Sequence, residues 1–414
     1  MKKIIPSKIR GNIKMIPSKS VSHRALICAA LANGKSILRN MAFSEDITAT
    51  ANALRDMGLC KYETDGYVCT VYGGFHEAGK KMIDCGESGS TLRFLIPLAL
   101  DGKERTFIGH GRLMRRPHDA YDRVFLRNNI RAEKQDNALT LCGTLESGEY
   151  AMPGNISSQF ISGLLYALPL LMDDSGIHLT TEIESQPYID LTRDIQRAFG
   201  VETKWRGNII DVFGRQGYRP CDMTIEGDYS HAAFFAVSAA LAGEVLLTGL
   251  KQETKQGDKE ILGILKCMGA DVEYRADGIL VKKNSLKPIE IDVSQIPDLV
   301  PVLAVLGCAA EGKTRIYNAG RLRYKESDRL HAITQELEKL GADIIEYEDS
   351  LTIHGKGMLN GGEVDSHADH RIAMALAVAS CISREPILLN GSEAVGKSAP
   401  LFFEEFASVG GCVR

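Results

Sequence analysis

The sequence lacks the features that mark membrane-spanning proteins, zinc and redox motifs, and the common nucleotide-binding loops. No run of 18 consecutive apolar residues occurs among the 414 residues, so a membrane-spanning helix is not expected. None of the ten cysteines forms a C-x-x-C pair, and buried free thiols of a reducing cytosol are expected instead. Walker A, G-x-G-x-x-G and G-x-S-x-G patterns are absent, so neither ATP nor NAD nor a serine nucleophile at an elbow is predicted.

Neither sign of charge is in large excess, with 49 Lys and Arg against 53 Asp and Glu, which argues against a broadly basic surface. The net charge is −4 and the sequence pI is about 6.2, which argues against nucleic acid as a partner. The chain starts with a strand-like stretch and no apolar signal region, so we expect a cytoplasmic protein with neither nucleic-acid nor membrane partners. Any basic site must be local.

A polar cluster followed by an apolar stretch of helix length recurs six times. The apolar stretches are nearly apolar all round and lead into short β-like segments such as 36–38 and 243–247, which predicts buried helices. They cover residues 20–33, 91–101, 159–172, 230–243, 299–312 and 370–383. The clusters are 69 to 71 residues apart and begin at Lys19, Ser88, Ser157, Asp228, Asp298 and Asp369.

A second, amphipathic helix is predicted in every repeat. In five of the six repeats it runs into a strand, and Gly269 and Gly341 stand where helix C-caps are expected. Six copies of one α/β unit account for the whole length, and the usual domain size favours two domains of three units each. These second helices are 70 or 71 residues apart and begin near Asp46, Pro117, Pro187, Asp258, Asp328 and Ala399.

The polar clusters combine hydroxyls with cations at helix starts, where free N–H groups and the helix dipole favour anions. Ser and Thr are ordinary N-caps, but capping does not require cations, which are disfavoured in a first turn unless a negative partner is present. We therefore predict anion binding. The cations concerned are Lys19, Arg24, Arg93, Arg116, Lys325, Arg329, Arg371 and Lys397.

A metal site is the alternative for one cluster, because His367, Asp369 and His370 lie close together in the sequence. The adjacent Arg371 and the lack of a second His/Cys group argue against it. We expect no metal and no cofactor.

Taken together, the motifs resemble the enolpyruvyl transferase family, and within it the members that act on shikimate-3-phosphate. The resemblance covers essentially the whole chain. Its motifs are PSKSVSHR at 17–24, GESGSTLR at 86–93, RP at 116–117, SSQF at 157–160, PYID at 187–190, EGD at 226–228, IPD at 296–298, KESDR at 325–329 and DHR at 369–371.

The resemblance implies a two-domain inverse α/β barrel built from six β-α-β-α-β-β repeats, with helices inside and sheets outside. It also implies a discontinuous domain of residues 1–17 plus 228–414, a second domain of residues 18–227, and an active site in the interdomain cleft. A monomer is expected, because the two halves can complete a site within one chain.

The reaction implied is transfer of the enolpyruvyl (carboxyvinyl) group of phosphoenolpyruvate to the 5-hydroxyl of shikimate-3-phosphate by addition and elimination. Phosphate is released, in the shikimate pathway to chorismate and aromatic amino acids. By resemblance, Asp298 is the candidate base, Glu326 the candidate acid, and Lys19 an electrostatic partner. Shikimate-3-phosphate is expected at Lys19, Ser20, Arg24, Ser157, Ser158, Gln159, Ser185, Tyr188, Asp298 and Lys325. Phosphoenolpyruvate is expected at Lys19, Gly89, Arg116, Gln159, Arg329, Arg371 and Lys397.

Two departures from the family pattern leave sensitivity to glyphosate, the family's inhibitor, open. His23 stands where the family often has Asn, and Glu87 with Ser88 replaces the Asn-Ala of some members.

Two alternative functions remain. The sister enzymes that use UDP-N-acetylglucosamine carry a cysteine in the loop before their Arg-Pro, and the loop at 109–117 here has none. A noncatalytic repeat scaffold would need polar helix starts but not both Asp298 and Glu326.

Overall fold

The chain divides into two compact units. The computed structural model describes residues 1–74 and 79–414. Unit 1 comprises Met1–Ser18 with Glu226–Arg414, and unit 2 comprises Lys19–Ile225. Each unit has its own hydrophobic core.

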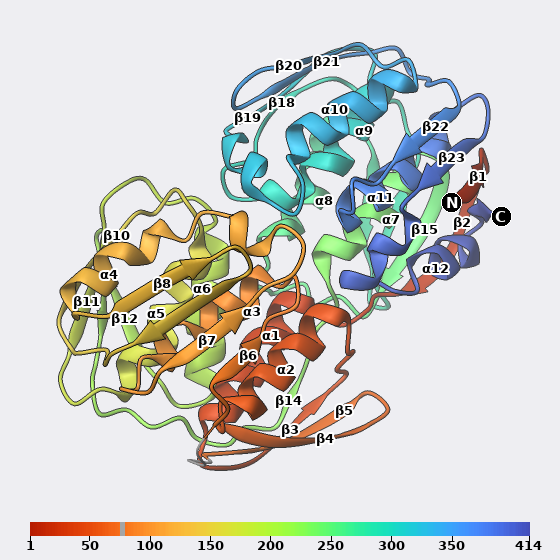
Figure 1. Ribbon diagram of the computed structural model, residues 1–414. Helices are drawn as coiled ribbons and strands as arrows, with labels where there is room; N and C mark the ends of the chain where they lie inside the picture. Colours follow the sequence, from red (N-terminus) through yellow and green to blue (C-terminus); the bar gives the residue numbers. More distant parts are fainter. Residues whose placement is uncertain (75–78) are drawn as a thin grey trace. The chain divides into compact units, whose positions relative to one another are not determined.

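Three four-stranded sheets form the β-structure described in unit 2 (Figure 1). The first sheet joins β3 (Gly34–Arg39), β4 (Cys60–Asp65), β5 (Val68–Gly73) and β14 (Met223–Thr224). The second joins β6 (Met82–Asp84), β7 (Arg105–Ile108), β8 (Arg131–Gln135) and β9 (Ala138–Cys142). The third joins β10 (Glu149–Met152), β11 (Ser175–Leu179), β12 (Thr203–Arg206) and β13 (Ile209–Val212).

Unit 1 repeats this plan with three more sheets. The first joins β2 (Ile9–Lys14), β15 (Gly243–Thr248), β16 (Asp271–Tyr274) and β17 (Ile279–Lys282). The second joins β18 (Glu290–Asp292), β19 (Gly312–Tyr317), β20 (Ile344–Glu346) and β21 (Leu351–Gly355). The third joins β1 (Lys2–Ile5), β22 (Gly362–Asp365), β23 (Ile387–Asn390) and β24 (Cys412–Val413).

All six sheets share one pairing pattern, which identifies them as copies of one unit. Each has one parallel edge pair followed by two antiparallel pairs, as in β6–β7, β7–β9 and β9–β8. Strands from elsewhere in the chain complete three of the sheets. The last strand of unit 2, β14, pairs with β3, while β2 pairs with β15 and β1 pairs with β23 and β24.

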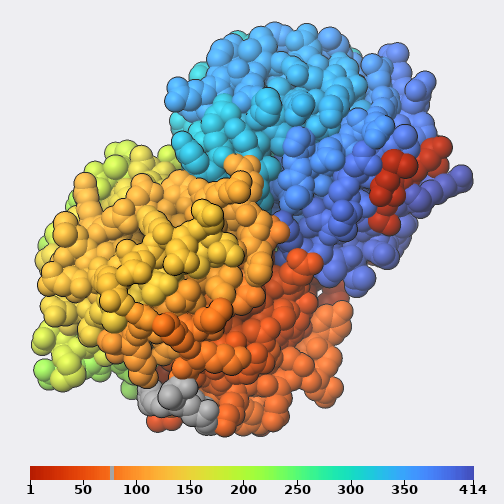
Figure 2. All heavy atoms as spheres, viewed as in Figure 1, coloured from red at the N-terminus to blue at the C-terminus, as the bar shows by residue number. Residues whose placement is uncertain are grey.

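The N-terminal strands therefore belong to the same compact unit as the C-terminal part of the chain. Figure 2 shows the first residues of the chain, in red, against residues of the C-terminal part, in blue. The chain passes between the units at two places, and the flanking segments are paired: Ser18 N–H donates to the Glu226 carbonyl at 2.8 Å, and Asp228 N–H donates to the Ile16 carbonyl at 2.9 Å.

Two helices accompany each sheet. In unit 2 they are α1 (Lys19–Leu31), α2 (Glu45–Asp56), α3 (Gly89–Leu95), α4 (Asp122–Arg127), α5 (Ser158–Ala167) and α6 (Gln186–Ala198). In unit 1 they are α7 (Tyr229–Ala242), α8 (Ile261–Met268), α9 (Val300–Ala309), α10 (Arg329–Lys339), α11 (His370–Ala379) and α12 (Phe402–Ser408). Short 3₁₀ helices are η1 (Pro97–Ala99), η2 (Leu113–Arg115), η3 (Asp119–Tyr121), η4 (Leu168–Leu170), η5 (Gly257–Glu260), η6 (Pro297–Leu299), η7 (Gly320–Tyr324), η8 (Ser380–Ile382) and η9 (Ser392–Lys397).

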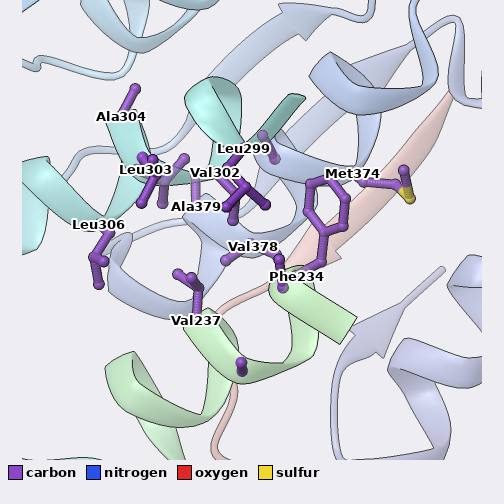
Figure 3. Close-up of a cluster of buried hydrophobic side chains, with 14 of the residues drawn as sticks. Phe234, Val237, Leu299, Val302, Leu303, Ala304, Leu306, Met374, Val378 and Ala379 are labelled. Carbon is purple, nitrogen blue, oxygen red and sulfur yellow. The ribbon is translucent and has the colours of Figure 1, made fainter. Parts of the chain in front are cut away.

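The first helix of every repeat is buried, which confirms the prediction from its all-round apolar sequence. Figure 3 shows α7, α9 and α11 contributing side chains such as Phe234, Val302 and Val378 to one cluster. Because the middle of such a helix is buried, only its ends can reach solvent or ligand, and in these helices the polar residues gather at the N-terminal end. Across the described ranges, no helix is both long and apolar enough to cross a membrane.

The structure corrects two details of the predicted helices and strands. The second helix of the second repeat begins at Asp122 rather than near Pro117, because η3 precedes it, with Tyr121 N–H donating to the His118 carbonyl. A strand follows the second helix in all six repeats, not five. The sixth, β24, has only two residues and pairs with β1. Gly269 and Gly341 do end their helices with φ of 103° and 83°.

Candidate active site

Lys19 is the first residue of α1, and its charge is compensated. Its Nζ lies 2.6 Å from Oδ2 of Asp46, in the first turn of α2. This carboxylate is the negative partner that a cation in a first helical turn requires. Asp46 was predicted as a helix start but not as a site residue.

Arg24 lies one turn further along α1 and is 3% exposed. Its Nε donates to Thr192 Oγ1 at 2.8 Å, and Nη2 donates to the Tyr188 carbonyl at 3.0 Å. Its Nη1 donates to the Ser20 carbonyl at 2.9 Å. Arg24 therefore brings the start of α1 together with the start of α6, where Ser20, Ser185 and Tyr188 were predicted to bind one substrate.

Arg93 and Gln159 connect the starts of α3 and α5. Arg93 Nη1 donates to Gln159 Oε1 at 2.8 Å, and Gln159 Nε2 donates to Ser90 Oγ at 2.9 Å. A Cβ added to Gly89 would lie 2.7 Å from Nη1 of Arg116. A larger residue at this position would displace that guanidinium, so glycine leaves the space that the Arg116 guanidinium occupies at the start of α3.

The serines of these helix starts serve as caps, as their types predict. Ser157 Oγ accepts from Gln159 N–H at 3.3 Å, and Ser88 Oγ accepts from Thr91 N–H at 3.2 Å. Ser158 follows Ser157 as the first residue of α5 and is buried. Ser185 differs: its φ is 56° and its side chain makes no cap hydrogen bond to α6.

His23, one of the departures from the family pattern, is buried and neutral. Its Nδ1 lies 2.7 Å from Thr50 Oγ1. Burial, followed by the charges of Lys19 and Arg24, holds the pKa of His23 well below its usual value. Thr50 Oγ1 in turn lies 2.6 Å from Thr91 Oγ1. His23 therefore takes part in a chain of side-chain contacts that joins α1, α2 and α3.

In unit 1, the Asp298 carboxylate lies among three cations. Its Oδ1 accepts from Arg329 Nη1 at 2.8 Å and from Lys325 Nζ at 3.3 Å. Its Oδ2 accepts from Arg371 Nη2 at 3.1 Å. Burial opposes ionisation, but Arg371, Lys325 and Arg329 outweigh it and hold the pKa of Asp298 well below the usual value.

Arg329 is 1% exposed and is the centre of this cluster. Its Nε donates to Asp369 Oδ2 at 2.7 Å, and its Nη2 donates to Glu326 Oε2 at 2.7 Å. With Asp298, three carboxylates surround one guanidinium. A buried ion group of this kind is tolerated because its hydrogen bonds are made. Asp369 also caps α11, accepting from Arg371 N–H at 2.9 Å.

Lys325 and Lys397 complete the set of unit 1 cations. Burial lowers the pKa of Lys325 to about 8, although Asp298 acts in the opposite direction. Lys397 ends η9, and its Nζ donates to the Ala368 carbonyl at 2.9 Å.

Comparisons with known proteins decide the family. The model of the EPSP synthase family, described as 3-phosphoshikimate 1-carboxyvinyltransferase, matches residues 4–406. The chain belongs to this family. A 3-phosphoshikimate 1-carboxyvinyltransferase of Clostridium kluyveri is 49% identical over 415 residues, which cover 99% of this chain and 97% of that protein. One of Clostridioides difficile is 47% identical over 428 residues, with coverage of 99% and 97%.

Solved structures agree with the assignment to the EPSP synthase family. An EPSP synthase of Acinetobacter baumannii matches with a TM-score of 0.83 and 29% identity, covering 100% of this chain and 99% of that chain. The enolpyruvyl transferase NikO of Streptomyces tendae shares the fold at a TM-score of 0.80 and 17% identity, covering 100% and 98%. The predicted two-domain inverse α/β barrel is confirmed, as is the prediction of a transferase rather than a scaffold.

The sequence analysis named the cations of the candidate site and two of their carboxylate partners, Asp298 and Glu326, but it did not assign Asp46 or Asp369 as partners of these cations. The structure brings Asp298, Lys325, Glu326, Arg329 and Arg371 together within unit 1. Within unit 2 it links the starts of α1 and α6, and those of α3 and α5. Asp46 and Asp258 both lie at the start of the second helix of their repeats. This shared position is the sequence signal that could have marked both as candidate site residues.

Proposed function

We propose that this chain transfers the enolpyruvyl group of phosphoenolpyruvate to the 5-hydroxyl of shikimate-3-phosphate and releases phosphate. The family match over residues 4–406 carries the proposal. The charge distribution supports it, because the two substrates are polyanions that must come into contact. Like charges about 4 Å apart repel by about 4 kcal/mol at an effective dielectric constant of about 20, so the site must supply cations.

Both units supply such cations at the starts of buried helices. Shikimate-3-phosphate is assigned to hydroxyl and amide groups with a few charges, which suit a molecule that carries both hydroxyls and phosphate. Its proposed partners are Lys19, Ser20, Arg24, Ser157, Ser158, Gln159, Ser185, Tyr188, Asp298 and Lys325.

Phosphoenolpyruvate is assigned mainly to arginines, whose forks bind carboxylate and phosphate through paired hydrogen bonds. The Arg116 guanidinium, in the space that Gly89 leaves at the start of α3, supports this assignment. The proposed partners are Lys19, Gly89, Arg116, Gln159, Arg329, Arg371 and Lys397.

The proposed chemistry has two stages, each with its proton accounted for. The 5-hydroxyl oxygen attacks C2 of phosphoenolpyruvate and loses its proton to Asp298, while C3 gains a proton from Glu326. The tetrahedral intermediate then loses a C3 proton to Glu326 and its C2–O bond to phosphate breaks, while the leaving phosphate takes up the proton held by Asp298, so both carboxyl groups return to their starting states. The surrounding cations hold the pKa of Asp298 low and so keep it ionised before the addition, which is the form that can accept a proton.

Lys19 is proposed to balance negative charge as it develops, as preorganised cations do in such sites. Its short contact with Asp46 holds the ammonium at the start of α1. We further propose that the protein acts as a monomer, because one chain carries every residue assigned to both substrates. We also propose that it acts in the cytoplasm. Size-exclusion chromatography with light scattering tests the monomer.

The test of the function is phosphate release from phosphoenolpyruvate without added metal. The acceptors are shikimate-3-phosphate and, in parallel, UDP-N-acetylglucosamine. Release only with shikimate-3-phosphate is expected. Release only with the nucleotide sugar would overturn the acceptor, and release with neither would overturn the function.

A further inference from the structure

The turn between β22 and α11 holds two consecutive residues in the left-handed conformation. His367 has φ of 51° and Ala368 has φ of 53°. Neither is glycine, and a Cβ makes this conformation unfavourable. Among the described residues this is the only adjacent pair of non-glycine residues with positive φ. Such strain persists only where the surroundings impose it, and it clusters at functional sites.

Glu336 of α10 contacts the residues that enter this turn, and the His367 N–H donates to Asp365 Oδ1 at 2.6 Å. Glu336 is fully buried, and its carboxylate accepts from three directions. Oε2 accepts from Asp365 N–H at 2.9 Å, Oε1 lies 2.7 Å from His367 Nε2, and Lys339 Nζ lies 2.8 Å from both oxygens. A carboxylate only accepts, so His367 Nε2 carries the hydrogen. Glu336 thus holds the turn at its entrance and at its first left-handed residue.

The other end of the turn meets two groups of the proposed site. The Ala368 carbonyl accepts from Lys397 Nζ at 2.9 Å. The next residue, Asp369, accepts from Arg329 Nε at 2.7 Å and caps α11, whose first turn contains Arg371. Ser366 supports the turn from within, accepting from Ala368 N–H at 3.2 Å and donating to the Gly391 carbonyl at 2.8 Å.

We propose that Glu336 and His367 are a positioning pair for the cations that bind phosphoenolpyruvate. The pair holds the turn in its left-handed form, which aims the Ala368 carbonyl at Lys397 and seats Asp369 on Arg329. Neither residue is assigned to touch substrate. The inference rests on the proposed function, which assigns Lys397, Arg329 and Arg371 to phosphoenolpyruvate.

A purely structural role and a positioning role differ in how they respond to relief of the strain. If the pair acts by holding the left-handed turn, a glycine at 368 should restore much of the phosphoenolpyruvate binding lost when the pair is removed, because glycine adopts positive φ freely. A pair that only stabilises the fold would instead lower the melting temperature and leave the kinetic constants alone.

The experiment compares His367→Ala, the double variant His367→Ala with Ala368→Gly, and the wild type in steady-state kinetics. His367→Ala should raise KM for phosphoenolpyruvate about tenfold while kcat changes less than about threefold, the pattern of lost binding. The double variant should recover most of that rise. His367→Gln, which keeps a donor, should stay within about threefold of the wild type.

A matched control lies on the same helix as Glu336. His331→Ala removes a similar but exposed pair, with Nδ1 at 3.2 Å from Glu346 Oε2, and should keep KM within about twofold of the wild type. Where His367→Ala does not fold, Glu336→Gln replaces it with the same expected rise in KM.

Either of two results would overturn the inference. One is an unchanged KM for phosphoenolpyruvate in folded His367→Ala or Glu336→Gln. The other is a raised KM that Ala368→Gly does not reduce. A wild type that releases no phosphate would instead overturn the proposed function, so the two failures are distinguishable.

Discussion

Replacing Asp258 by asparagine is expected to stabilise the protein at pH 8, although it removes a charge near Arg371. Asp258 is 1% exposed and lies in η5 at the start of the second helix of its repeat. Ser230 Oγ donates to its Oδ2, while its Oδ1 has no hydrogen-bond partner among the described residues. A buried carboxylate with one oxygen unpaired costs free energy when it is ionised.

The size of the effect follows from the pKa. Burial raises the pKa of Asp258 from 3.8 to about 6, with Arg371 acting to lower it and Asp298 and Asp228 acting to raise it. At pH 8 the group is ionised in both folded and unfolded chains, so the folded state bears the difference of about two pKa units, or about 3 kcal/mol. Between the two pKa values the folded state binds more protons, so this cost fades as the pH falls and is gone below about pH 4.

The assay is urea unfolding of wild type and Asp258→Asn at pH 8 and pH 4, followed by far-ultraviolet circular dichroism. Tryptophan fluorescence is unsuitable because Trp205 lies in unit 2, on β12. The variant should gain up to about 3 kcal/mol at pH 8 and nearly nothing at pH 4. Asp277→Asn, at an exposed position of unit 1, should change stability by less than about 0.5 kcal/mol at either pH. A destabilised Asp258→Asn at pH 8, or a gain equal at both pH values, would refute the reasoning.

Three further predictions concern the proposed site. Glu326→Ala should abolish turnover while calorimetry still detects binding of shikimate-3-phosphate; loss of binding together with turnover would contradict the proposed role as acid. Because burial lowers the pKa of Lys325 to about 8, its charge is lost as the pH rises through that value, so kcat/KM for shikimate-3-phosphate should fall above pH 8. Lys325→Ala should have a low kcat/KM at every pH and should not show this decline. An identical decline in the variant would exclude Lys325 as its cause. Asp369→Ala removes the carboxylate that binds Arg329 Nε at 2.7 Å, and urea unfolding should show that the free energy of unfolding falls by about 3 to 5 kcal/mol. A fall below about 1 kcal/mol would show that Glu326 and Asp298 suffice to balance the buried Arg329 charge.

The fold was largely predictable because the repeat makes buried helices visible in the sequence. A helix apolar all round, such as 230–243, has few structural explanations other than burial, and six such segments at one spacing define the unit. The pairing of β1 with β23 and β24 has no comparable signal, since a strand's sequence does not name its neighbour. The family resemblance implied only that the N-terminal strand joins the C-terminal half, and it did not give the strand's neighbours.

The sequence drew attention to the cations of the candidate site, and the family resemblance named Asp298 and Glu326, but nothing singled out Asp46 as a partner of Lys19. Cations at helix starts contradict the helix dipole and therefore stand out, whereas Asp46 at the start of a helix is an ordinary residue there. The left-handed turn at His367 and Ala368 had no clear sequence signal either, because Ala does not favour positive φ. One of the contacts at this turn comes from Glu336, 31 residues earlier in the chain.

The paired state of these cations also constrains how substrate can bind. Arg329 and Arg371 both donate to Asp298, and Lys19 contacts Asp46, so an arriving anion finds cations whose charge is already partly balanced. Displacing a carboxylate from Arg329 would leave a buried negative group unpaired, which costs more than the new contact returns. Binding is therefore expected to add to the existing contacts rather than replace them, while Asp298 keeps enough cationic contact to stay ionised.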